Sequence, residues 1–277
     1  MSKAADKVIQ IVRFSLQQRI QHGLLAVSVL MLIFTGFPIK YSAEPWAGYA
    51  IKLFGGFGNL FLFHQVFAVL MVLTAAYHVV WLIWTFIKKG PSWEMIPTIK
   101  DFKDAIHHAK YLLGMTDTPP QYGRYSYLEK FEYFAVIWGV IVMGFSGLIL
   151  WFPGMFYWMP RWAFGVARVV HSNEAFICML ALFVGHFFHV HFHPRVFPSS
   201  LVWLNGKMSL HHLKEEHPLE YEQLIKAHPE LKDAKAEEHH SRWARSKILI
   251  YGELVFFLGL FAYLLYTFVP LFLQDLI

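Results

Sequence analysis

The sequence is poor in cysteine. Its single cysteine, Cys178, lies inside an apolar run, so the chain cannot form an internal disulfide. One thiol also excludes the Cys-x-x-Cys-His attachment of c-type haem and an iron–sulfur cluster held by cysteines of this chain. Any redox centre held by the protein must therefore use histidine.

Charge is scarce as well. Charged residues make up 16% and hydrophobic residues 56% of the 277 positions, whereas soluble domains average about 25% charged residues. The apolar residues gather in blocks of about twenty, the length at which a helix crosses a bilayer. Five blocks are expected to span a membrane: residues 23–39, 60–87, 131–152, 167–192 and 248–273. We predict one domain over residues 1–277, an all-α integral membrane bundle of about five transmembrane helices.

The basic residues indicate how this bundle is oriented. Lys and Arg gather before the first span, after the second and after the fourth, and few lie in the other connections. The positive-inside rule then puts the N-terminus in the cytoplasm. Because the net charge of +5 resides in these loops, we expect lipid and no nucleic acid as a partner. We also expect cytoplasmic helices within residues 195–247, and a first span that is retained rather than cleaved as a signal peptide.

Histidine, in contrast, is abundant. Several of the sixteen lie in the apolar blocks, where a polar side chain is costly unless it has a partner or a function. His64 and His78 are fourteen residues apart, nearly four helical turns, so they share one face of the second span at roughly 21 Å separation. His171 and His186 are fifteen apart on the fourth span, about 22 Å. Both spans run inwards, so His64 matches His171 in depth and His78 matches His186.

Facing imidazoles at two depths can each give an axial nitrogen to a b-type haem. Helical phase therefore predicts an outer haem between His64 and His171 and an inner haem on His186 and His78, passing electrons through the membrane. His22, at the start of the first span, could equally serve the inner haem, or bind a haem propionate or a quinone. Two alternatives stay open: a non-redox membrane anchor whose histidines cross-link helices, and a transition-metal transporter, which the scarcity of carboxylates in the spans disfavours.

The other histidines are expected to be wetted. They are His189, His191 and His193 at the inner end of the fourth span, and His107, His108, His211, His212, His217, His228, His239 and His240 in loops.

Several motifs, in order, resemble the cytochrome b (gamma) subunit of respiratory formate dehydrogenases, within a wider group of b-type cytochromes of membrane nickel–iron hydrogenases and thiosulfate reductases. The resemblance covers about residues 13 to 225. It is carried by Arg19-Ile20-Gln21-His22, His64, Tyr122-Gly123-Arg124-Tyr125, Glu129-Lys130, Ser146-Gly147, His171, His186, Gly206-Lys207-Met208-Ser209, Glu216-His217-Pro218 and Tyr221.

The resemblance implies a di-haem electron-transfer subunit of a respiratory complex in the bacterial inner membrane, with no substrate-converting site of its own. It implies an outer haem on His64 and His171, an inner haem on His22 and His186, and a quinone, menaquinone or ubiquinone, near the inner haem. The implied outer-face partner is an iron–sulfur protein or a multihaem cytochrome c. His78 would then bond a propionate or quinone, or join His189 around a third haem.

This chain departs from the formate-type pattern in three ways. The two fourth-span ligands are normally fourteen residues apart, so at fifteen we expect a π-type bulge or a tilted ring at His186. Ser126 replaces an amide that tends to lie near the quinone. A fifth span has no counterpart in the formate-type subunit, so formate specificity is not expected.

Overall fold

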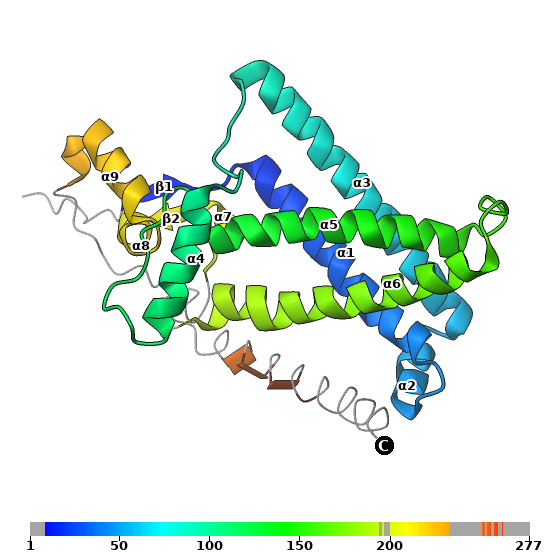
Figure 1. Cartoon of the computed structure of the whole chain (residues 1–277). Coiled ribbons are helices and arrows are strands. Elements are labelled where there is room, and N and C mark those ends of the chain that lie inside the picture. The colour runs from blue at the N-terminus through cyan, green and yellow to red at the C-terminus, as the bar shows by residue number, and fades with distance from the viewer. Residues whose placement is uncertain are drawn as a thin grey trace, which may run out of the picture.

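Four long helices dominate the computed structural model (Figure 1). They are α1 (Leu16–Lys40), α3 (Phe57–Lys89), α5 (Tyr127–Trp151) and α6 (Arg161–Leu180), the last continued by the π-helical segments η1 (Ala181–His186) and η2 (Phe188–Phe192). Each is long and apolar enough to cross a membrane. The structure describes residues 9–193, 196, 200–232, 251, 252, 254, 255, 258, 259 and 262. The helical membrane bundle is thereby confirmed, while most of the predicted fifth span, 248–273, lies outside the described residues.

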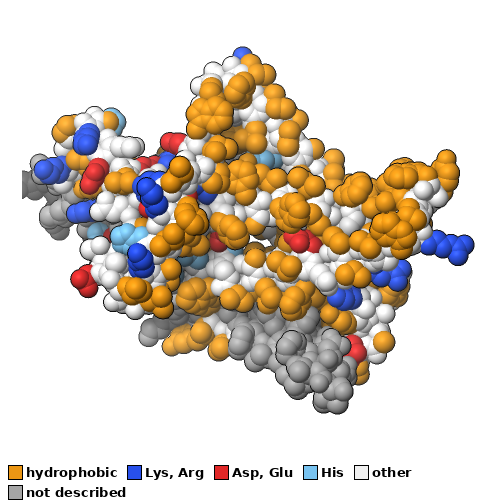
Figure 2. All heavy atoms as spheres, viewed as in Figure 1, with side chains coloured by type: hydrophobic (Ala, Val, Ile, Leu, Met, Phe, Trp, Pro, Cys, Tyr) orange, Lys and Arg blue, Asp and Glu red, His pale blue; other side chains and the backbone are white. Residues whose placement is uncertain are grey.

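The exposed surface of these helices is apolar, as expected for helices in contact with lipid. Few of their side chains are buried within the described chain, and large apolar residues such as Leu73, Ile141 and Phe145 are exposed along them. Figure 2 shows hydrophobic side chains covering the long helices, whereas many charged side chains gather at the end where α4, α8 and α9 lie. Such exposure would be unfavourable in water, at roughly 25 cal/mol for each Å² of apolar surface, and is not penalised in hydrocarbon.

The four helices pack as two pairs. α1 packs most extensively against α3, and α5 against α6, while the contacts between the two pairs are fewer. Serine caps set where two of these helices begin, because Ser15 and Ser126 each form a capping box with the residue three positions later, Gln18 and Glu129. The sparse contact between the pairs leaves room inside the bundle.

Shorter elements close the two ends of the bundle. α2 (Pro45–Leu53) joins α1 to α3, and α4 (Ile99–Leu112) lies at the other end, where Asp101 binds Lys130 of α5 at 2.9 Å. At that same end the strand β1 (Gln10–Val12) pairs antiparallel with β2 (Lys207–Ser209). The helices α7 (Val202–Asn205), α8 (Leu210–Glu216) and α9 (Pro218–Ala227) and the 3-10 turn η3 (Pro229–Leu231) flank this ribbon. Helices were expected in this segment, but the ribbon was not.

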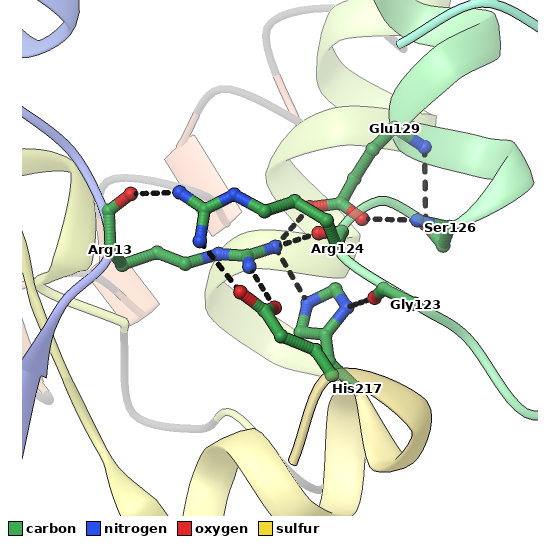
Figure 3. A network of polar contacts seen from close by, with 7 residues as sticks. Arg13, Gly123, Arg124, Ser126, Glu129 and His217 are labelled. Carbon is green, nitrogen blue, oxygen red and sulfur yellow. Dashed lines mark hydrogen bonds and ion pairs between the residues drawn. The ribbon is translucent and has the colours of Figure 1, made fainter. Parts of the chain in front are cut away.

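A buried polar network, here called the platform, fastens these end segments together (Figure 3). It comprises Arg13, Gly123, Arg124, His217 and Glu220. Arg13 is 2% exposed, and its guanidinium binds the Glu220 carboxylate and the Arg124 carbonyl. Arg124 in turn donates to Glu220 at 2.6 Å and to the Arg13 carbonyl at 2.8 Å. Segments more than two hundred residues apart in sequence are thereby joined.

His217 belongs to this platform, which corrects the expectation that it is solvated. It is 6% exposed, its Nδ1 binds the Gly123 carbonyl at 2.8 Å, and its Nε2 lies 3.2 Å from an Arg13 amino group. Because the carbonyl can only accept and the guanidinium can only donate, His217 is neutral with its proton on Nδ1. The error has a simple cause: a histidine in a charged segment looks exposed until its distant partners are known.

Candidate functional site: two facing histidine pairs

A cavity of about 2890 Å³ runs between the helix pairs. It is lined by all five histidines singled out from the sequence: His22, His64, His78, His171 and His186. Pockets for drug-sized ligands are usually about 300 to 1,000 Å³. The cavity is therefore large enough for more than one bulky group.

The first pair joins α3 to α6. The ring centres of His64 and His171 lie 6.4 Å apart. Imidazole–metal bonds are about 2.0 Å long, so two imidazoles on opposite sides of one metal ion have ring centres roughly 6 Å apart once the ring radii are added. The spacing of this pair fits a single ion held between the rings.

Hydroxyl groups fix the tautomer of both rings. Thr35 donates to the Met31 carbonyl at 2.7 Å and lies 2.9 Å from His64 Nδ1. Ser146 donates to the Val142 carbonyl at 2.6 Å and lies 3.0 Å from His171 Nδ1. Since each hydroxyl proton is already used within its own helix, the oxygen accepts from Nδ1–H. The Nε2 lone pair of each ring is then available to a metal.

A glycine follows each of these hydroxyl residues and makes room for the ring. A Cβ on Gly36 would lie 3.1 Å from His64 Cε1, and one on Gly147 would lie 3.3 Å from His171 Cε1. The same hydroxyl–glycine step thus positions one histidine from α1 and the other from α5. Ser146-Gly147 belongs to the motifs noted in the sequence, but Thr35-Gly36 was missed, although a small polar and a small apolar residue late in a span is a recognisable signal.

The second pair joins α1 to the π-helical part of the fourth span. His22 and His186 have ring centres 6.2 Å apart, close to the spacing of the first pair. His186 ends η1, so the expected π-type bulge is confirmed. A π-bulge adds one residue to an α-helical turn, which lets His186 face the cavity although it stands fifteen residues after His171.

Glu132 of α5 was missed by the sequence reasoning. Its Oε2 lies 2.9 Å from His186 Nδ1, so the carboxylate accepts a hydrogen bond from Nδ1–H and leaves the Nε2 lone pair of His186 available. An acidic residue inside a predicted span is the signal that could have revealed it, because such residues rarely persist there without a task. Within the described residues, neither ring nitrogen of His22 has a hydrogen-bond partner; its ring lies 6.0 Å from that of Trp203.

His78 contacts different residues. Its Nδ1 lies 2.8 Å from Gln21 Oε1 and its Nε2 lies 2.9 Å from the Tyr133 hydroxyl, so both ring nitrogens are engaged. The structure therefore places His186 beside His22, while His78 forms a cluster with Gln21 and Tyr133. His189, which could have joined His78, packs against the ring of His193 at 5.6 Å.

Pairs of histidines suit one class of metal site in particular. Across the part of the chain that the structure describes, no three His, Cys, Asp or Glu side chains group closely enough to hold a metal ion. Zinc sites use three or four protein ligands. Two facing imidazoles are sufficient when a macrocycle supplies the other four nitrogens, as porphyrin does for haem iron.

Comparison with known proteins agrees with this donor set. A search of curated proteins finds no match. A family model described as prokaryotic cytochrome b561 matches residues 13–204, a range that contains the five histidines singled out from the sequence and covers more than half of the chain. The protein therefore belongs to the prokaryotic cytochrome b561 family, membrane proteins that bind b-type haem and transfer electrons.

Proposed function

We propose that this chain is the di-haem cytochrome b subunit of a respiratory oxidoreductase complex in the bacterial cytoplasmic membrane. It exchanges electrons between a redox partner on the outer face and the quinone pool near the inner side. The observation that carries the proposal is the presence of two imidazole pairs, 6.4 and 6.2 Å between ring centres, in one cavity. Bound haem iron supplies the one-electron chemistry, and the protein supplies placement and electrostatics.

The axial ligands are His64 with His171 at one haem and His22 with His186 at the other. Ser146 and Glu132, which bind a histidine of each pair, are fourteen residues apart on α5, or roughly 21 Å along the helix axis. The two histidine pairs would therefore hold two haems at different levels of the bundle. Each haem would supply one-electron chemistry at its own level.

A quinone headgroup fits the cluster of Gln21, His78 and Tyr133. Gln21 adjoins His22 in α1, and Tyr133 adjoins Glu132 in α5, so the cluster lies at about the same level of the bundle as the second histidine pair. Gln21 is 7% exposed, and its amide Nε2 is buried with no hydrogen-bond partner among the described residues. A quinone carbonyl, or alternatively a haem propionate, would accept that hydrogen bond. A third haem on His78 would require Tyr133 to release the Nε2 atom.

Haem counting tests the ligand assignment. We expect two b-haems for each unmodified chain, one after His22→Ala, one after His64→Ala, and two after His78→Ala, because His78 already has partners for both nitrogens. The measurement is the haem-to-protein ratio, together with the reduced-minus-oxidised visible spectrum. Loss of a haem in His78→Ala but not in His22→Ala would reverse the inner assignment, and three haems in the unmodified chain would reveal a further pair.

The partner is tested separately. Purification in mild detergent followed by mass spectrometry should recover an iron–sulfur protein or a multihaem cytochrome c with this subunit, and extraction of the same preparation should yield its menaquinone or ubiquinone. A haem-loaded chain that copurifies with no redox protein would contradict the complex while leaving the haem assignment intact.

A further inference from the structure

The two histidine pairs differ in the charge of their hydrogen-bond partners. His64 and His171 donate to neutral hydroxyls, those of Thr35 and Ser146. His186 donates to a carboxylate, that of Glu132, at 2.9 Å. Both His186 and Glu132 line the cavity, and within the described chain no cation is paired with that carboxylate.

A carboxylate partner changes an imidazole ligand in a definite direction. It draws the Nδ1 proton away from the ring, which makes the opposite nitrogen a stronger electron donor to iron. Its negative charge also stabilises the oxidised haem, whose iron carries one more positive charge than the reduced form. Hydrogen bonding to the axial ligand and local charge are two of the means by which a protein sets a haem potential.

We propose that Glu132 is a positioning residue that lowers the reduction potential of the haem held by His22 and His186. The consequence concerns the direction of electron transfer, which the ligand set alone leaves open. Lowering the potential at this pair moves the electron toward the haem between His64 and His171, whose ligands have only neutral partners. Glu132 therefore contributes driving force from the inner haem to the outer one.

The test is a spectroelectrochemical titration of the purified complex. In Glu132→Gln we expect the haem content to stay unchanged and one of the two midpoint potentials to rise, with at least a tenfold change in the reduced-to-oxidised ratio, equal to about 59 mV for one electron. The other potential stays within a threefold change in that ratio. In Glu132→Asp, which keeps the carboxylate, the midpoint potential should stay close to that of the unmodified protein.

Glu174→Gln is the matched control. It removes a carboxylate from α6 that approaches Cys178 at 3.9 Å and has no hydrogen bond to a cavity histidine. If the same midpoint potential rose equally in Glu174→Gln, the effect would be one of bulk charge and the proposal would be overturned. Unchanged midpoint potentials in Glu132→Gln, or loss of a haem from that variant, would also overturn it. The inference rests on the proposed ligation, which His186→Ala tests by itself. Retention of both haems in His186→Ala would refute the ligand assignment. Loss of one haem in His186→Ala, combined with unchanged midpoint potentials in Glu132→Gln, would refute only the role of Glu132.

Discussion

At the scale of single residues, hydroxyl groups of the chain fix the tautomer of two of the four proposed ligands, His64 and His171. The hydroxyls of Thr35 and Ser146 donate to carbonyls of their own helices, so toward the histidine they can only accept a hydrogen bond. This leaves one tautomer, with Nε2 directed to the cavity. The histidines could be identified from the sequence because a polar side chain inside a membrane span is costly unless it has a function. The hydroxyls could not be assigned, because a Ser or Thr in a membrane helix usually bonds only its own backbone.

The hydroxyl on α5 should therefore affect haem retention. Ser146→Ala removes the acceptor that orients His171, and loss of such a partner typically weakens metal binding about 10- to 100-fold. We expect faster transfer of one haem, the one held by His64 and His171, to a haem-free acceptor protein. Ser172→Ala is the control, because the Ser172 hydroxyl bonds the Arg168 carbonyl of its own helix. Equal transfer rates in the two variants would count against the role of Ser146.

At the scale of secondary structure, the long helices could be predicted from the length of the apolar blocks, but block length alone does not predict where a helix becomes irregular. The π-helical segment η1 could be expected only because fifteen residues separate two histidines that must face one cavity. The ribbon of β1 and β2 could not be foreseen, since strands of three residues have no periodicity and these two are almost two hundred positions apart. The two strands are brought together by the contacts of the platform rather than by the local propensity of their residues.

The π-helical segment makes a prediction about spacing. Deleting Val184, which is 67% exposed, returns the separation of His171 and His186 to fourteen residues and lets the segment become α-helical. We expect two haems to be retained. Inserting an alanine after Val184 should instead turn His186 by about 100° away from His22 and remove one haem. Haem-to-protein ratios distinguish these outcomes, and the haem of His64 serves as the internal control. Loss of a haem in the deletion variant would show that the bulge has another purpose.

At the scale of the whole molecule, the platform determines how the extramembrane segments sit on the bundle. Arg13 precedes α1, Arg124 precedes α5, and Glu220 belongs to α9, so one buried ion network ties three parts of the chain. Breaking a buried pair by removing one partner typically costs about 3 to 5 kcal/mol, because a charge is left buried and unpaired. The family match ends at residue 204, before His217 and Glu220. The sequence motifs include Gly123, Arg124 and His217, but Arg13 and Glu220 belong to none of them, and His217 was expected to be solvated. The mutual contact of these residues required the fold.

The platform should loosen in acid. Burial, together with the adjacent Arg13 cation, lowers the pKa of His217 below its usual 6.5, although Glu129 and Glu220 partly oppose the shift. The folded state then binds the His217 proton more weakly than the unfolded state, so the stabilisation is present above pH of about 6.5 and is lost as the pH falls through the folded pKa. His212 of α8, whose pKa burial also lowers, titrates in the same direction.

Hydrogen exchange measures this response directly. Between pH 7 and 5, after correction for intrinsic exchange, amide protection in residues 207–227 should fall relative to that of α5, because protonated His217 would present a second N–H to Arg13, which has no acceptor to offer. His217→Gln, which cannot titrate, should show a shallower fall, with the remainder due to His212. The haem-to-protein ratio should stay constant throughout, because none of the four proposed ligands belongs to the platform. An identical pH response in His217→Gln and the unmodified chain would show that other groups control the attachment of this segment.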